Sequence, residues 1–389
     1  MQNIHVAIDL GATSGRVITE QGGVFEEIHR FLTPMVKRAD GIYWDFTELF
    51  AGIIAGLQKL SAVAGNIASI SCDSWAQDFG MLDENGTLIA DPVSYRDTNS
   101  AIFSRDRLEY IEKRFPERFV RAKQILHIAD LVHYKLCGAA RSNYTLAAIS
   151  RLPLEHKLLS PLADCEIIGN VNHPELPHLA GIPVISGAGH DTAAAYSGGE
   201  VGAADALVSL GTWLMVASPE TSGTDLPQDK TLPLPYRQIA STAGGMGMWP
   251  FQQCVKLWKS SGRFPGYADL DKAAAASDIE GMILPDTPEL FSPENMEQAI
   301  FKLYGRELSP AEVTALLLRG TAQSIADKLA SFGKKFAHVI LVGGGSGGKF
   351  MRELIAAKVD APLVFGNTEA SAAGNIIIQK KVLAHLSRS

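Results

Sequence analysis

The chain has 389 residues, of which 46% are hydrophobic and 20% are charged. This length and composition predict a globular protein of two ordinary domains with a full hydrophobic core. The formal net charge of -7 argues against a nucleic-acid-binding surface, which needs a basic face. An anionic small molecule remains a possible ligand, because backbone N–H groups can hold a phosphate on an acidic protein.

The sequence predicts a cytoplasmic protein without a membrane partner. The first residues, "MQNIHVAIDL", lack the basic segment and apolar stretch of a signal peptide. No window approaches the 18 uninterrupted apolar residues that indicate a membrane span. The four cysteines form no C-x-x-C pair, so we expect buried thiols in a reducing compartment. The sequence makes no prediction of the oligomeric state.

Predicted strands and helices alternate through the first half of the chain. In order they are a hairpin over 4–10 and 15–20, a helix over 47–61, a strand over 66–72, a hairpin over 79–90, and a strand over 183–188 that leads into a turn and a helix. The helix is predicted from apolar side chains at helical spacing. The second hairpin is predicted from Asn85-Gly86, a pair that favours tight turns.

The second half repeats this alternation. Its predicted elements are a strand, turn and strand over 206–218, a surface loop over 219–237, a helix over 309–333 that begins at the Ser309 capping box, and a strand over 337–345. Alternating elements of this kind predict an α/β protein. We place the boundary near 197–203, which gives an N-terminal domain over 1–198 and a C-terminal domain over 199–389.

Two stretches of the chain share one pattern. "AIDLGATSGRVIT" and "LVSLGTWLMVA" each contain an apolar strand, a Leu-Gly pair, a small polar turn and another apolar strand, and the pairs begin at Leu10 and Leu210. An internal repeat at this spacing predicts two similar domains that face one another across a cleft. A chance similarity between two hairpins is the alternative.

The first of these turns has the chemistry of a phosphate site. Gly11 allows close approach of the backbone, and Thr13 and Ser14 add hydroxyl donors. Asp9 would repel a phosphate unless a cation lies between them, and Mg²⁺ prefers such a carboxylate together with phosphate oxygens. Gly211 and Thr212 offer the same donors from the second half. An ordinary hairpin with a solvated Asp9 is the alternative.

Three further stretches carry candidate site residues. Asp191 follows a strand at a predicted helix start, where the free N–H groups would lower its pKa and keep it ionised. It could accept a proton from a hydroxyl, or could simply cap the helix. The glycine run 343–345 follows a strand and could hold a ribose or a flat ring. The polar stretch "CDSWAQDFG" (72–80) suits a polyhydroxylated ligand, with Trp75 against a sugar face; a surface loop with a packed Trp75 is the alternative.

Taken together, these motifs resemble the FGGY carbohydrate kinases of the actin, hexokinase and Hsp70 ATPase superfamily, and most closely those that act on L-rhamnulose. The resemblance spans nearly the whole chain, in order: "AIDLGATSGRV", "YWDFTEL", "DSWAQDFGMLDENG", "PVSYRDTN", "GAGHDTAAA", "SLGTW", "VGGG" and "EASAAGNIIIQ". It implies two ribonuclease-H-like domains around a central cleft. The N-terminal domain would bind the sugar and the C-terminal domain the nucleotide.

The resemblance also implies a role for each candidate residue. Asp191 falls on the catalytic base and Asp9 on the position near Mg²⁺. The sugar-contacting positions fall on Trp75, Ala76, Gln77 and His190. The ATP-binding positions fall on Gly11, Thr13, Ser14, Arg16, Gly211, Thr212, Gly343, Gly344 and Gly345.

Some positions depart from the family pattern. Gly348 stands where these relatives usually carry Asn, and Arg352-Glu353 stand in place of an Asn-Gln pair. The chain is shorter after Asn99, and Gln77 replaces an apolar residue. We expect ATP- and Mg²⁺-dependent phosphorylation of a small ketose, with L-rhamnulose 1-phosphate as the leading product. The alternatives are a kinase for fuculose, xylulose or a linear polyol-like signal, and a degenerate relative that binds a sugar or nucleotide without turnover.

Overall fold

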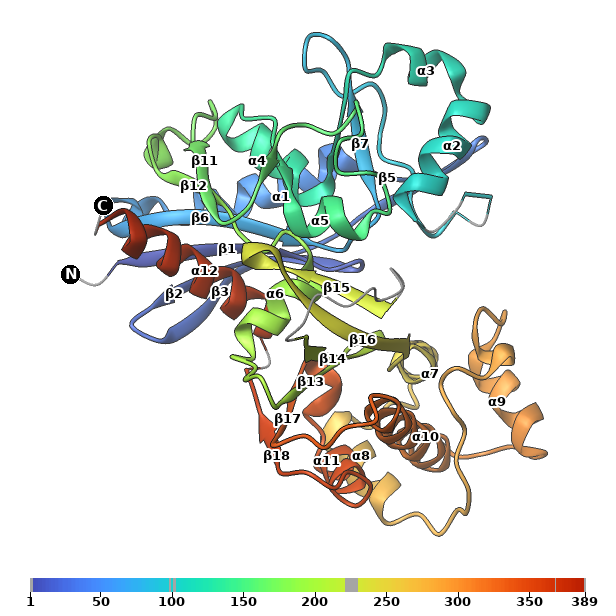
Figure 1. Ribbon diagram of the computed structural model, residues 1–389. Helices are drawn as coiled ribbons and strands as arrows, with labels where there is room; N and C mark the ends of the chain where they lie inside the picture. Colours follow the sequence, from blue (N-terminus) through green and yellow to red (C-terminus); the bar gives the residue numbers. More distant parts are fainter. Residues whose placement is uncertain (1–2, 98, 101–102, 221–229, 368, 388–389) are drawn as a thin grey trace. The chain divides into compact units, whose positions relative to one another are not determined.

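The computed structural model describes residues 3–97, 99–100, 103–220, 230–367 and 369–387 (Figure 1). The chain divides into two compact units, each of which is described by itself. Unit 1 comprises Met1–Gly198, Thr231–Ile239 and Ala370–Ser389, and unit 2 comprises Gly199–Lys230 and Ala240–Glu369. The first division follows Gly198, close to the predicted boundary. The last twenty residues, which the sequence analysis assigns to the second domain, lie in unit 1 because the helix that they form packs on its sheet.

Unit 1 is built on a six-stranded sheet of order β11-β12-β6-β1-β2-β3. The strands are β1 (Ile4–Leu10), β2 (Ser14–Gln21), β3 (Val24–Leu32), β6 (Ile67–Ser74), β11 (Glu166–Asn170) and β12 (Pro183–Ser186). Strands β1, β2 and β3 are antiparallel neighbours, as the predicted hairpin requires, whereas β1, β6 and β12 run parallel. The carboxyl ends of three strands therefore meet at one edge of the sheet.

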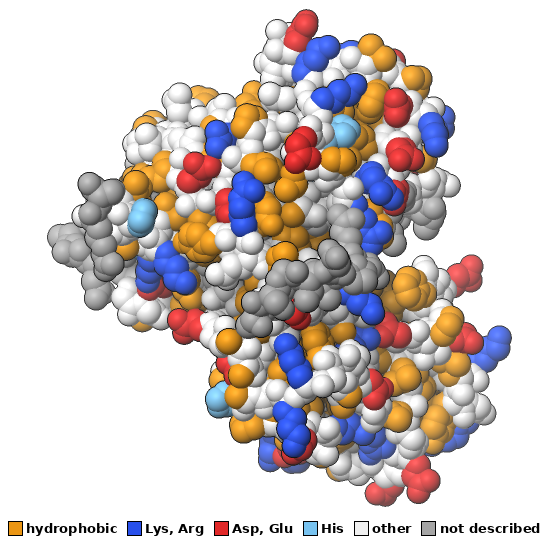
Figure 2. All heavy atoms as spheres, viewed as in Figure 1, with side chains coloured by type: hydrophobic (Ala, Val, Ile, Leu, Met, Phe, Trp, Pro, Cys, Tyr) orange, Lys and Arg blue, Asp and Glu red, His pale blue; other side chains and the backbone are white. Residues whose placement is uncertain are grey.

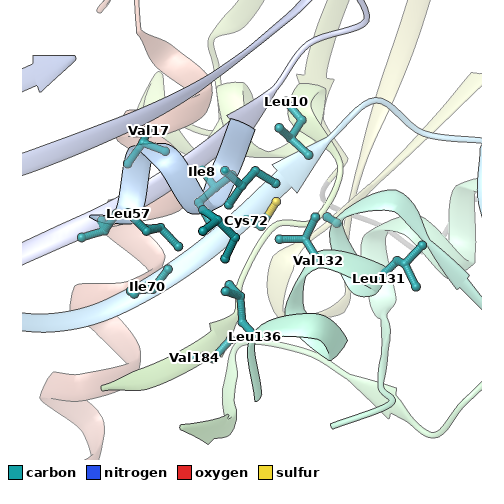
Figure 3. Packing of buried hydrophobic residues seen from close by; sticks show 14 of the residues in the cluster. Ile8, Leu10, Val17, Leu57, Ile70, Cys72, Leu131, Val132, Leu136 and Val184 are labelled. Carbon is teal, nitrogen blue, oxygen red and sulfur yellow. The ribbon is translucent and has the colours of Figure 1, made fainter. Parts of the chain in front are cut away.

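Helices cover both faces of this sheet. On one face, α1 (Phe46–Gln58) packs on β2 and β3, and α4 (Ile128–Cys137) packs on β6 and β12. Figure 3 shows their side chains meeting Ile8 and Leu10 of β1 in a common core. On the other face, α12 (Ala370–Leu386) packs on β1 and β6, beside α6 (Asp191–Gly198). Alternate residues of β1 thus serve two cores, because successive side chains of a strand point to opposite faces.

A smaller group of elements in unit 1 has a core of its own. It contains β4 (Met35–Arg38), β5 (Gly41–Trp44), β7 (Phe79–Leu82), β8 (Gln124–His127), α2 (Ser104–Arg114) and α3 (Pro116–Arg121). The predicted hairpin over 79–90 is only partly correct. The turn forms at Gly86, but β7 pairs with β8 over its length and meets the predicted second arm only at a bridge between Leu82 and Leu88. Nothing in the local sequence indicates this distant partner.

The remaining elements of unit 1 are short. They are β9 (Ser142–Asn143), α5 (Tyr144–Ile149), β10 (Leu162–Ala163) and β15 (Thr231–Leu234). The last of these corrects the predicted surface loop over 219–237, whose residues 221–229 lie outside the described part. Leu232 and Leu234 are buried, and β15 contacts α5 and α6.

Unit 2 contains a second sheet, and five of its strands follow the order β16-β14-β13-β17-β18. These strands are β13 (Ala206–Leu210), β14 (Trp213–Pro219), β16 (Gln238–Met246), β17 (Val339–Val342) and β18 (Leu363–Phe365). The helices are α7 (Trp249–Ser260), α8 (Tyr267–Ala275), α9 (Met296–Tyr304), α10 (Pro310–Ala330) and α11 (Lys349–Ala356). Helix α10 begins with the predicted capping box between Ser309 and Glu312.

The two sheets share a topology. In each, the first strand (β1 or β13) begins a run of three consecutively antiparallel strands on one side, which continues through β2 and β3 or through β14 and β16. On its other side two strands follow in parallel pairing, β6 and β12 or β17 and β18. The two similar hairpins begin at equivalent places in this pattern. The repeat in the sequence is therefore a repeat of the fold, and the prediction of two ribonuclease-H-like domains is confirmed.

Within the described residues, none of the helices has both the length and the apolar character that a membrane span needs. Figure 2 shows acidic and basic side chains interspersed over the face in view, a distribution that agrees with the modest net charge of -7.

Candidate functional site

Three carboxylates of unit 1 lie at the carboxyl ends of parallel strands. Asp9 and Asp73 occupy paired positions on β1 and β6. Asp191 follows β12, and a parallel bridge between Ser74 and His190 ties its loop to the end of β6. Asp9 and Asp191 are predicted site residues, and the sheet brings them to the same edge.

Asp9 belongs to the turn between β1 and β2. Its carboxylate is paired with the guanidinium of Arg16, which is its partner in the β1–β2 register. The turn is closed by a hydrogen bond from the Gly11 N–H to the Ser14 carbonyl at 3.0 Å. Thr13 is exposed at its tip. The predicted phosphate-binding residues thus form one accessible turn, next to a carboxylate whose charge is balanced by an arginine.

Asp191 is the first residue of α6. Its Oδ1 accepts hydrogen bonds from the N–H of Thr192 at 2.6 Å and from the Thr192 hydroxyl at 3.1 Å. These contacts are with the adjacent residue, whereas a helix N-cap accepts from the N–H groups two or three positions further on. Asp191 therefore lacks the usual N-cap hydrogen bonds, and its role as a catalytic base stays a prediction.

The surroundings of Asp191 raise its pKa to about 7. Burial is the larger cause and the negative charge of Asp9 the second. The side chain still exposes 32% of its surface, so a ligand can reach it. A carboxylate with a pKa near neutrality suits a general base, because it both accepts a proton and is ionised at the working pH. The predicted lowering of this pKa at the helix start is wrong, because burial and the charge of Asp9 outweigh the effect of the helix N-terminus.

His190 lies beside Asp191 in the neutral form. Its Nε2 is 3.4 Å from Asp191 Oδ1, and burial lowers the pKa of the imidazole to about 4. Its Nδ1 has no hydrogen-bond partner among the described residues. Nδ1 is therefore a buried polar atom without a partner among the described residues, and contact of His190 with a sugar stays a prediction.

Asp73 lies in the polar stretch 72–80, but the sequence predicts no role for it. It is fully buried, and its Oδ2 accepts a hydrogen bond from Asn375 Nδ2 of α12 at 2.7 Å. Burial and then the charge of Asp9 raise its pKa well above the usual range. Asp73 could have been identified as a candidate site residue from the sequence, because it lies at the end of an apolar strand as Asp9 does. The partner from the far end of the chain could not be predicted.

The predicted sugar-contacting loop is held by a buried carboxylate. Asp78 accepts hydrogen bonds from the indole N–H groups of Trp44, at 2.5 Å, and Trp75, at 2.8 Å, and pairs with Arg107. The two indole rings lie 4.4 Å apart, and Trp75 is only 6% exposed. Trp75 is therefore packed, as in the alternative, but the stretch 72–80 is largely buried and is not a surface loop.

The next two residues of the loop differ in their surroundings. Ala76 is half-buried against the main core of unit 1. The Gln77 amide donates to the Ile149 carbonyl at 3.1 Å and accepts from the Ser104 N–H at 2.9 Å. Gln77 therefore fixes the loop to α2 and α5. Direct contact of Trp75, Ala76 or Gln77 with a sugar stays a prediction.

Unit 2 contains a cavity of about 1110 Å³. It brings together four of the predicted ATP-binding residues from segments more than a hundred positions apart, namely Gly211, Thr212, Gly344 and Gly345. Gly343 adjoins the cavity, where the chain turns with a φ of +87°. The Thr212 hydroxyl is 3.0 Å from Gln252 Oε1, and the Gly211 N–H closes its turn on Trp213, much as Gly11 closes on Ser14.

The rest of this cavity is partly aromatic and partly charged. Its wall includes Phe251, Tyr267, Asp271, Lys272, Phe350 and Glu353. Ligand sites commonly combine apolar walls with a few polar groups in this way. The volume and the lining fit a nucleotide. Arg352, one of the departures from the family pattern, lies over Phe365 and donates to the Ser346 carbonyl at 2.8 Å.

The described residues fit a Mg²⁺ ion held mainly by oxygen atoms of a ligand. They contain no group of three or more His, Cys, Asp or Glu side chains that could hold a metal by itself. Mg²⁺ commonly uses one or two carboxylates together with water and substrate phosphates. The charge of Asp9 raises the pKa of both Asp73 and Asp191, so a cation at Asp9 would relieve an existing repulsion.

Comparisons with known proteins agree with these features. Residues 206–381 match the model of the C-terminal domain of the FGGY family of carbohydrate kinases. A rhamnulokinase of Bacteroides thetaiotaomicron is 28% identical over 97% of this chain and 90% of its own length. One of Enterobacter sp. (strain 638) is 29% identical over 98% of this chain and 90% of its own. The first alignment covers 448 positions, so that relative contains segments that this chain lacks.

Solved structures show the same fold. The gluconate kinase of Lactobacillus acidophilus superposes with a TM-score of 0.77 at 14% identity, covering 99% of this chain and 90% of that one. The xylulose kinase of the same organism gives a TM-score of 0.76 at 14% identity, covering 98% and 90%.

Proposed function

We propose that this chain is a carbohydrate kinase of the FGGY family, on the basis of these similarities, and that it transfers the γ-phosphoryl group of ATP to a small ketose. The leading substrate is L-rhamnulose and the leading product L-rhamnulose 1-phosphate. The similarity to rhamnulokinases over nearly the full chain supports this choice. We also propose that the enzyme acts in the cytoplasm.

The observation that carries the proposal is the placement of Asp191. It lies at the sheet edge that holds Asp9, it is reachable from solvent, and the pKa of its carboxyl is about 7. In phosphoryl transfer the protein mainly positions the reactants and stabilises charge, and a carboxylate accepts the proton of the attacking hydroxyl. Asp191 would take this proton from the primary hydroxyl of the sugar.

The other predicted residues would hold the donor. Asp9 would hold Mg²⁺, which when bound neutralises charge on the phosphate oxygens. The turn from Gly11 to Arg16 and the Gly211-Thr212 turn offer backbone N–H groups and hydroxyls to the phosphates. The unit 2 cavity would accommodate the nucleoside. Neutral His190, the residue before Asp191, would bind a sugar hydroxyl.

The test is a panel of ketoses with ATP and Mg²⁺, read by ADP release and by identification of the phosphorylated product. We expect L-rhamnulose to give the highest kcat/KM and the 1-phosphate. A higher value for fuculose, xylulose or a linear polyol would transfer the proposal to that substrate. Sugar or nucleotide binding by calorimetry, with no ADP formed from any ketose, would instead identify a degenerate relative that binds without turnover.

A further inference from the structure

We propose that Asp271 selects the base of the nucleotide donor by accepting a hydrogen bond from an amino group on the base. This inference rests on the proposed function, since it concerns the nucleotide that the unit 2 cavity would hold. It assigns a specificity-determining role to Asp271. Gly348, which lies beside Asp271 in the fold, is one of the positions at which this chain departs from the family pattern.

The glycine-rich segment before α11 places Asp271 at one end of the cavity. At Gly345 an added Cβ would lie 2.8 Å from both the Leu210 carbonyl oxygen and Met248, at the end formed by β13 and its turn. At Gly348 an added Cβ would lie 2.6 Å from Asp271 Oδ1. The segment therefore runs from the predicted phosphate-binding turn, after β13, to Asp271 on α8. A nucleotide with its phosphates at Gly211 and Thr212 would direct its base toward Asp271.

One carboxylate oxygen of Asp271 accepts a hydrogen bond, and the other accepts none from the described residues. Its Oδ2 accepts a hydrogen bond from the Phe350 N–H at 3.1 Å. Within the described residues it makes no ion pair and no other hydrogen bond. Its Oδ1 lies next to Gly348, which has no side chain to crowd it, and both residues line the cavity. The bond to Phe350 fixes the orientation of the carboxylate, so Oδ1 is a positioned acceptor.

The chemistry of this end matches the amino edge of a purine. Tyr267 and Phe350 line the same cavity and offer aromatic surface to a flat ring. A carboxylate accepts hydrogen bonds only, so it favours a base with an N–H donor at its edge, such as adenine. It disfavours a base that presents a carbonyl oxygen there. A hydrogen bond to a charged group makes a difference of about tenfold to a hundredfold in affinity.

The experiment measures nucleotide binding in the absence of sugar. The probes are ATP, ITP, which has a carbonyl oxygen in place of the amino group, and purine riboside triphosphate, which has neither. For the unaltered chain we expect affinity for ATP to exceed affinity for each of the other two by about tenfold or more. Equal affinity for ATP and purine riboside triphosphate would overturn the inference.

Two variants and a control make the test specific. In Asp271→Asn the amide oxygen would keep the Phe350 hydrogen bond and the NH₂ group would face the cavity, so we expect ATP to weaken about tenfold and ITP to bind at least as well as ATP. Gly348→Ala, which displaces the carboxylate, should lose the preference for ATP. Asp269→Asn, an exposed change on the same helix, should keep it. A uniform loss for all three nucleotides in Asp271→Asn would contradict the role.

The result separates this inference from the proposed function. If the chain phosphorylates a ketose with ATP but does not distinguish ATP from purine riboside triphosphate, the role of Asp271 falls and the kinase remains. If no nucleoside triphosphate binds, both fall.

Discussion

Replacing Asp191 by Asn should abolish most of the turnover and at the same time stabilise the protein. The pKa of Asp191 rises from 3.8 to about 7 in the folded chain, first through burial and then through the charge of Asp9. The fold therefore favours the protonated form. An ionised Asp191 costs stability, and Asn, which carries no charge, removes that cost.

The size of the effect follows from the pKa. A rise from 3.8 to about 7 corresponds to about 4 kcal/mol. Because about a third of the side chain is open to water, solvent screens the charge, and we expect about 2 kcal/mol. The sign depends on pH. The unfolded chain loses this proton near pH 4 and the folded chain near pH 7, so the stability of the unaltered protein falls between these values relative to that of the variant.

The assay is urea unfolding of both proteins from pH 5 to pH 8, together with steady-state kinetics. The difference in free energy of unfolding should favour Asp191→Asn and grow with pH until it levels off above about 7. The turnover of the variant should fall by about 10²–10⁴, the usual loss for a general base, while ATP affinity stays within a few fold. A variant that is less stable at pH 8, or a difference that does not change with pH, would refute the electrostatic reasoning. Retained turnover would refute the assignment of the base.

Three further changes test other parts of the account. Thr212→Val removes the hydroxyl that lies 3.0 Å from Gln252 Oε1 and that would donate to a phosphate. Calorimetry should show ATP affinity lowered by about tenfold and sugar affinity unchanged; unchanged ATP affinity would place the phosphates elsewhere. Gly374→Ala would put a Cβ 1.8 Å from the Ala194 carbonyl oxygen, between α12 and α6. Denaturant unfolding should therefore show that the free energy of unfolding falls by more than about 3 kcal/mol; a fall of less than about 1 kcal/mol would show that the two helices are not so closely packed. Ser309→Ala removes the hydroxyl that caps α10, because Ser309 Oγ accepts a hydrogen bond from the Glu312 N–H at 3.3 Å. Denaturant unfolding should show a loss of about 1 kcal/mol of stability, and kcat and KM should not change; a changed kcat would mean that α10 has a part in the reaction.

The sequence predicted best those features that depend on neighbours in the chain. The hairpin of β1 and β2, helix α1 and the capping box of α10 follow from periodicity and turn chemistry, and all three are present. The similarity between the stretches around Gly11 and Gly211 correctly indicated a repeated fold. In each case the residues that specify the element are adjacent or lie within one turn of each other.

The features that the sequence did not predict depend on distant partners. Strand β8 completes the pairing of β7 from about forty positions away, and α12 returns to unit 1 so that Asn375 meets Asp73. The pKa of Asp191 was expected to be low because of the helix start. Burial and the charge of Asp9, which only the folded sheet brings near, raise it instead. Electrostatic consequences of this kind require the three-dimensional arrangement.

The most direct test of the central claim is the reaction itself, followed with ATP, Mg²⁺ and a panel of ketoses, with the product identified by mass spectrometry and phosphorus NMR. The account predicts formation of a ketose 1-phosphate and an equal amount of ADP, fastest with L-rhamnulose. No phosphorylated sugar from any member of the panel, under conditions in which the chain binds both ATP and a ketose, would contradict it.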